Sequence, residues 1–134
     1  MGETLKEKET NEFSIAPVYD NGASFVSKHT DDKLSRLLSD EKIFKNSVLN
    51  GMCYYTIDNK LVNFLNLFNE LRNKGLSEEL DNAIKRVIPK INSNWETIQD
   101  FINNMPGIED DIEIISDVKK EFFIRSMKCR IDSI

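Results

Sequence analysis

The feature that most constrains the fold is a helical spacing of apolar residues through the second half of the chain. Leu61, Phe64, Leu65, Phe68 and Leu71 recur at i, i+3, i+4, i+7 and i+10, which places them on one face of a helix. Similar apolar stripes run through residues 80–88, 95–105 and 112–131. We therefore expect a mainly α-helical protein whose helices bury these stripes against one another.

Residues with strong positional preferences mark the expected ends of these helices. Gly75 predicts a stop after Lys74, because glycine readily adopts the left-handed conformation at a helix C-terminus. Ser77 should cap the next helix, and Pro89 should kink or end it because proline has no N–H to donate. The remaining boundaries are predicted at Ser93 or Asn94, at Pro106-Gly107 and near residues 109–111.

Upstream of residue 60 the patterns are shorter. Thr4-Leu5-Lys6 and residues 12–15 predict the two arms of a β-hairpin, which Pro17 ends. Thr30 should cap a short helix, and Ser39-Asp40-Glu41 should cap a second short helical turn. Residues 53–57 predict a loop or a short extended segment. The expected core is aromatic: Phe64, Phe68, Trp95, Phe101, Phe122 and Phe123.

Composition limits the classes of partner. The formal net charge is −5 and no dense basic run occurs, so we expect neither nucleic acid nor membrane as a direct partner. Residues 1–10 are polar and lack the apolar centre of a secretory signal. Cys53 and Cys129 lie far apart without metal-ligand spacing, as expected for reduced thiols. These observations predict a cytoplasmic protein with one domain.

The segment with the most specific pattern is Ala-Pro-Val-Tyr-Asp-Asn-Gly-Ala-Ser-Phe at residues 16–25. By itself, Asn21-Gly22 predicts a tight turn, because both residues tolerate positive φ. Together with the strand before it, however, the segment resembles the hallmark of HipA-like serine/threonine kinases. The resemblance implies that Asp20 binds the Mg²⁺ that bridges the ATP phosphates, with Asn21 and Gly22 shaping the loop.

The resemblance continues downstream. Relatives of this type, including the bacterial proinflammatory kinase subgroup, carry a short Lys-apolar segment with an amphipathic helix. A helix ending in Ala-x-x-Arg-x-x-Pro-x-Ile follows, and the last helix has an aromatic pair, a Met and an Arg. The corresponding segments here are 59–64, 83–91 and 119–130. The implied fold is the helical C-terminal lobe of a protein-kinase-like domain over residues 1–134. Residues 1–29 would form the hairpin and metal-binding loop, and residues 30–134 the helical bundle.

The chain departs from the family pattern upstream of Asp20. The residues before it contain no catalytic loop, no glycine-rich loop and no phosphate-gripping lysine in a usable context. We therefore expect a truncated, excised or split kinase, with no catalytic residue in this chain and no phosphoryl transfer by it alone. Whether it counts as an enzyme stays open. Its implied partners are a separate N-terminal kinase half or an antitoxin-like protein, and a protein substrate.

Two other functions remain as alternatives. The chain could be a non-catalytic helical interaction module derived from the same fold, in which case apolar residues should be exposed. A small hydrolase or ligand-binding domain has less support, because no nucleophile–base pair, zinc spacing or phosphate loop is found. Outside the loop, His29 is expected to be an ordinary surface residue, and Ser24 and Ser27 are candidate phosphorylation sites.

Overall fold

The computed structural model describes residues 4–6, 13–15, 29–109, 111–113 and 115–134. Within these ranges the protein is mainly helical, which confirms the predicted class at that coarse level. The helices are α1 (Asp31–Ser39), α2 (Glu41–Leu49), α3 (Phe64–Asn73), α4 (Ser77–Ser93), α5 (Trp95–Asn103) and α6 (Asp117–Asp132). No helix in the described ranges has the combination of length and apolar character that crossing a bilayer requires.

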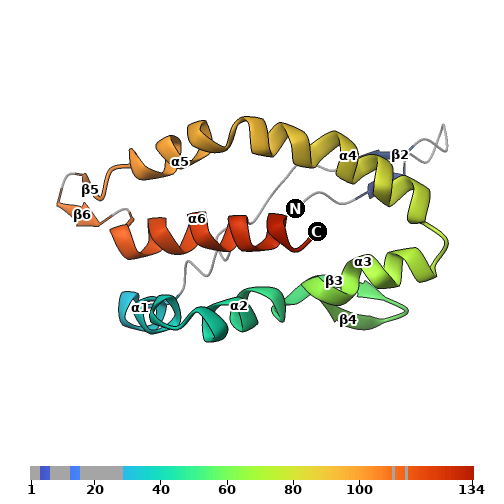
Figure 1. Ribbon diagram of the computed structural model, residues 1–134, viewed down its shortest axis with the longest axis horizontal. Helices are drawn as coiled ribbons and strands as arrows, with labels where there is room; N and C mark the ends of the chain where they lie inside the picture. The colour runs from blue at the N-terminus through green and yellow to red at the C-terminus, as the bar shows by residue number, and fades with distance from the viewer. Residues whose placement is uncertain (1–3, 7–12, 16–28, 110, 114) are drawn as a thin grey trace.

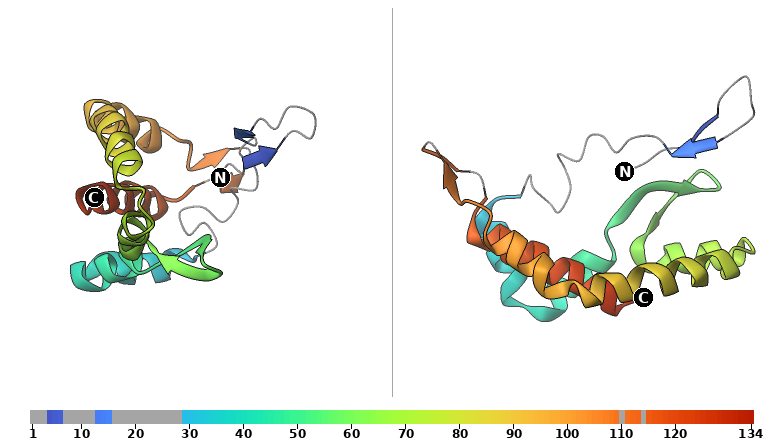
Figure 2. Two further views of the ribbon diagram at one scale, coloured as in Figure 1. Left: turned by 90° about the vertical axis from the view of Figure 1, so that its right-hand side faces the viewer. Right: turned by 90° about the horizontal axis from the view of Figure 1, so that it is seen from above.

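Helix α6 lies at the centre of the bundle. Figures 1 and 2 show it between a layer formed by α4 and α5 and a layer formed by α1 and α2. It packs on α1, α2 and α5, whereas α4 packs on α3 and on its neighbour α5. The last helix of the chain therefore joins layers that are formed by segments distant in the sequence.

The buried core lies where α6 meets α1 and α2. Leu34, Phe44, Val48 and Phe122 form one cluster of buried side chains, and Leu37, Leu38, Leu49, Val118, Phe123 and Cys129 pack around it. In α1 and α2 the buried side chains lie on one apolar face. Helix α6, which packs on helices on both sides, buries Lys120 and Ser126 as well as Phe122. Fully burying a side chain of this kind is worth about 1.5–3 kcal/mol.

Caps fix where α1 and α2 begin. The Thr30 Oγ1 accepts a hydrogen bond from the Lys33 N–H, 3.4 Å away, as the sequence predicted. The Asp40 carboxylate accepts from the N–H groups of Lys42 and Ile43 at 2.9 and 3.0 Å. These acceptors satisfy donors that have no partner inside a helix. The second helical turn expected after Asp40 is thus a nine-residue helix.

The N-terminal hairpin is confirmed in its paired residues. Strand β1 (Thr4–Lys6) runs antiparallel to β2 (Phe13–Ile15), with Thr4 opposite Ile15 and Lys6 opposite Phe13. The connection between the strands, the start of the second arm at residue 12, and Pro17 fall outside the described residues.

A second hairpin replaces the expected early start of the third helix. Strands β3 (Met52–Ile57) and β4 (Lys60–Asn63) are antiparallel, and Asp58 and Asn59 between them have φ of 51° and 61°. Positive φ at both turn residues suits the two-residue turns that connect twisted strands. Leu61 therefore belongs to β4, and α3 begins at Phe64 with the Asn63 side chain as its cap.

Helix α4 differs from the prediction at its start, and it continues past Pro89. It has no side-chain cap at its start, since Ser77 is its first residue and Leu76 precedes it. Pro89 does not end the helix, which continues to Ser93. There the Asn94 Nδ2 donates to the Lys90 carbonyl at 2.8 Å. This bond satisfies one of the carbonyls left without a partner at the helix end.

The start of the last helix was also predicted incorrectly. Strand β5 (Ile108–Glu109) pairs antiparallel with β6 (Ile112–Glu113), so α6 does not begin near Glu109. It begins after Ser116, whose Oγ accepts from the Lys119 N–H at 3.3 Å. The same hydroxyl donates to the Asp31 carboxylate at 2.8 Å, which connects the starts of α6 and α1.

The aromatic core was predicted only in part. Phe122 is buried, whereas Phe64, Phe68, Trp95 and Phe123 are half-buried and Phe101 is 68% exposed. Phe64 and Phe68 form their own edge-to-face pair on α3, with ring centroids 5.5 Å apart. The main aromatic contact of the core instead uses Phe44, which was not among the aromatic residues expected in the core.

We predict that Phe44→Ala destabilises the protein by about 3–5 kcal/mol, because it leaves a cavity in the buried cluster. Phe101→Ala is the matched control, since it removes the same group from an exposed position, and it should change the free energy of unfolding by less than about 0.5 kcal/mol. Urea unfolding followed by circular dichroism measures both values. Equal effects of the two substitutions would contradict the assignment of the core.

Candidate functional site

The residues of the predicted metal-binding loop lie outside the described part of the chain. This applies to Asp20, Asn21 and Gly22, and also to Ser24 and Ser27. His29 is the first described residue after them; it is half-buried and sits in a bend before the Thr30 cap. Residues 23–30 separate the loop from the start of α1 in sequence, and its role in metal binding stays a prediction.

The described residues do not offer an alternative metal centre. Among them, no three His, Cys, Asp or Glu side chains come together in a way that could hold a metal ion.

One polar junction in the described structure centres on Arg125 of α6. Its guanidinium donates to the Glu41 carboxylate at 2.7 Å and to the Leu38 carbonyl at 3.2 Å. The same group lies over the Phe44 ring, 4.7 Å from its centroid, and also pairs with Glu121 at 3.3 Å. Arg125 thus connects α6 to the ends of α1 and α2, next to the buried cluster.

Lys120 makes a second polar connection one turn earlier. It is 8% exposed, and its Nζ donates to the Asn103 carbonyl at 3.2 Å, at the C-terminal end of α5. A cation at a helix C-terminus is favourable because the last carbonyls carry partial negative charge. The Asp117 carboxylate lies 3.5 Å away and provides a counter-charge.

A cleft of about 260 Å³ lies beside these two cations. Asn103, Asp117, Lys120, Glu121, Ile124 and Arg125 line it. Because the ion pairs within this set already neutralise the lysine and the arginine, the cleft does not present free positive charge to an anionic ligand. Its side chains hold helices together, which is a sufficient reason for their positions.

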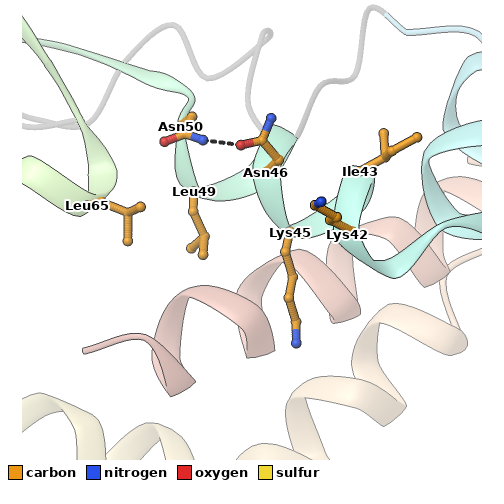
Figure 3. A pocket seen from close by; sticks show the side chains of 7 residues that line it. All are labelled: Lys42, Ile43, Lys45, Asn46, Leu49, Asn50 and Leu65. Atoms are coloured by element: carbon orange, nitrogen blue, oxygen red, sulfur yellow. Dashed lines mark hydrogen bonds between the residues drawn. The ribbon is translucent and has the colours of Figure 1, made fainter.

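A larger and more apolar depression lies on the outer face of α2. It has a volume of about 600 Å³ and is lined by Lys42, Ile43, Lys45, Asn46, Leu49, Asn50 and Leu65; we call this set the α2–α3 hollow. Figure 3 shows Leu49 of α2 and Leu65 of α3 side by side, with the Asn46–Asn50 hydrogen bond at one edge. The hollow is open to solvent, as a surface for another macromolecule would be.

Sequence reasoning missed this surface because it treated residues 41–48 as a short turn. The signal was present, since Lys42, Lys45, Asn46 and Leu49 follow one another at helical spacing on one face. The contribution of Leu65 could not be read from that spacing, because it depends on how α3 is placed beside α2.

Two titratable side chains respond to their surroundings. The hydrogen bond from Arg72, 2.7 Å away, lowers the pKa of Asp81 from its ordinary value, and this exposed pair links α3 to α4. Burial raises the pKa of the Cys129 thiol, which reduces its thiolate fraction at neutral pH. The raised pKa disfavours a role of Cys129 as a nucleophile, because the thiolate is the reactive form.

Comparisons with models of protein families, with curated proteins and with solved structures found no match to this chain. The likeness to HipA-like kinases therefore rests on the sequence motifs alone.

We predict that Arg125→Met destabilises the protein by about 1–3 kcal/mol, because the Leu38 carbonyl and the Glu41 carboxylate lose a charged donor. Lys45→Met is the matched control. It removes a cation that also pairs with Glu41, at 3.3 Å, but whose side chain is 58% exposed, so the loss should stay below about 0.5 kcal/mol. Chemical denaturation measures both, and a loss for Lys45→Met as large as that for Arg125→Met would contradict this role.

Proposed function

We propose that this chain is the helical C-terminal part of a HipA-like serine/threonine protein kinase. Its contribution to the kinase is the loop Asp20-Asn21-Gly22, which provides one half of a Mg-ATP site, and the bundle that supports this loop. The observation that carries the proposal is the run of residues 16–25, followed by the family's downstream segments in the expected order.

Two of these downstream segments fall in helices that suit the proposal. Residues 83–91, with the Arg86 and Pro89 of the pattern, lie within α4, and residues 119–130 lie within α6. In α6 the aromatic pair and Arg125 form the junction with α1 and α2. The pattern therefore has a structural use in this chain: it attaches the last helix to the segment that follows the loop.

The chemistry assigned to the loop is limited. Bound Mg²⁺ would supply charge stabilisation at the ATP phosphates. The Asp20 carboxylate would hold the ion, and Gly22 would allow the backbone to turn beside it. The base and the phosphate-binding lysine must come from elsewhere, so the chain transfers no phosphoryl group by itself. The partners proposed are an N-terminal kinase half or an antitoxin-like protein, and a cytoplasmic protein substrate.

Exposed apolar side chains support a role within a larger assembly. Large apolar residues are exposed on several elements: Ile43, Leu61, Leu65, Leu76, Val87, Phe101, Ile108, Ile112 and Ile134. Further kinase segments would cover part of this surface. The same observation favours a second candidate, a non-catalytic interaction module derived from the same fold, which would bind its partner without nucleotide.

Calorimetric titration with Mg-ATP distinguishes the two candidates. We predict that the wild-type chain binds ATP only in the presence of Mg²⁺, and that Asp20→Asn lowers the affinity at least about tenfold, a loss of about 1.4 kcal/mol. Asp32→Asn is the matched control, because Asp32 is an exposed carboxylate in the first turn of α1 and should leave binding unchanged.

Equal affinity of the wild-type and Asp20→Asn proteins would contradict the assignment of the metal ligand. Absence of binding by both would overturn the Mg-ATP half-site and leave the interaction module as the better account.

A further inference from the structure

The layer formed by α4 and α5 carries charge of opposite sign in its two halves. Residues 82–95 include basic residues but no Asp or Glu, whereas residues 96–118 include acidic residues but no Lys or Arg. Four exposed side chains of this layer form no ion pair with any other described residue: Arg86, Lys90, Glu96 and Asp100. These charges are therefore available to a partner.

Apolar side chains are exposed on the same two helices. Val87 of α4 is 43% exposed and Phe101 of α5 is 68% exposed. A depression of about 550 Å³ surrounds Phe101, and its lining residues are Thr97, Asp100, Phe101, Asn104, Met105 and Pro106. In the right panel of Figure 2, seen from above, α4 and α5 lie in front of α6 with no described element over them. A second molecule can therefore reach this layer.

The charges are arranged symmetrically about the point where the two helices meet. Arg86 lies seven residues before Ser93 and Asp100 seven residues after it. Lys90 and Glu96 each lie three residues from Ser93 on opposite sides. If two such layers packed antiparallel about a two-fold axis at this point, each basic side chain of one copy would lie opposite an acidic side chain of the other. Every such pairing would occur twice, because a two-fold interface uses the same surface on both copies.

We propose that two copies of this chain associate through α4 and α5, antiparallel about a two-fold axis near Ser93 and Asn94. Val87 and Phe101 each lie seven residues from Asn94, so Phe101 of one copy lies opposite Val87 of the other and both lose exposed apolar surface. The local pairing of opposite charges is needed, because two copies that each carry a net charge of −5 otherwise repel one another.

The shape of the layer sets the expected strength. Residues 77–103 span roughly 40 Å along the two helices, but Figure 1 shows the layer bowed away from α6. Two bowed layers meet only near their middle, where the four charged side chains lie. The contact is therefore smaller than a standard stable interface of roughly 1,600 Å², and we expect weak, concentration-dependent dimers. This inference uses no residue of the Asp20 loop and is independent of the kinase proposal.

Sedimentation velocity over micromolar to millimolar protein tests the contact through charge exchange. The α4 variant is Arg86→Glu with Lys90→Glu, and the α5 variant is Glu96→Lys with Asp100→Lys. Each variant alone should associate at least about tenfold more weakly than wild type, because like charges then meet at both contacts. An equimolar mixture of the two should regain association, since one copy then presents only acidic side chains and the other only basic ones.

The protein that carries all four substitutions separates local pairing from net charge. It keeps the net charge of −5 and restores every opposite pair, so it should associate as strongly as wild type.

Three further controls address net charge, apolar contact and folding. Lys33→Glu with Lys42→Glu changes the net charge as much as the α4 variant does, at exposed lysines of α1 and α2, and should weaken association less. Phe101→Ala should weaken association without changing the charge. Circular dichroism confirms that each variant is folded.

A wild-type protein that stays monomeric throughout would overturn the inference. So would a mixture of the α4 and α5 variants that associates no more strongly than either variant alone, or a fourfold variant that fails to associate while the wild type does. Titration with Mg-ATP depends on none of these outcomes, so failure here and failure of the kinase proposal can be told apart.

Discussion

The structure depends most on the contact between Phe44 of α2 and Phe122 of α6. Their rings meet edge to face, with centroids 5.6 Å apart and an interplanar angle of 81°. Leu34 and Val48 complete the buried cluster, and Arg125 covers the outer face of the Phe44 ring. Because this one cluster joins residues that are almost eighty positions apart in sequence, it holds the last helix against the first two.

The α3–α4 side of the bundle is packed far less tightly. Neither α3 nor α4 contributes a buried residue. The Phe64–Phe68 pair lies within α3, and the exposed ion pair of Arg72 with Asp81 links α3 to α4. Exposed ion pairs contribute little stability. The stability of this side would increase if another protein segment covered its apolar residues, which agrees with a role within a larger assembly.

Local signals in the sequence predicted local structure well. Thr30 caps α1, Gly75 follows α3 with φ of 82°, and the paired strands of the first hairpin are where alternation placed them. The failures concern competition between neighbouring elements. Leu61 fits both the apolar spacing of a helix and a strand. The turn at Asp58-Asn59 connects β3 to β4 and so places Leu61 in the strand. Phe101 has the spacing of a core residue, but α5 lies at the edge of the bundle and leaves it in solvent.

The candidate sites also differ in how far the sequence alone can predict them. The Asp20 loop could be proposed from its sequence, because its motif is short and contiguous, but it lies outside the described residues and remains a prediction. The α2–α3 hollow needs Leu65 of α3 to lie near α2, so no single stretch of sequence predicts it. Lys120 likewise gains its partner from the end of α5, which periodicity alone does not indicate.

The central claim is that the α1–α2–α6 cluster supports a more loosely packed α3–α4 side. Native-state hydrogen exchange tests it most directly, because local opening is measured at each amide. The account predicts the slowest exchange in α6 around Phe122 and in α2 around Phe44, with amides in the middle of α4 exchanging at least about tenfold faster. Equal protection of α4 and α6 would contradict it.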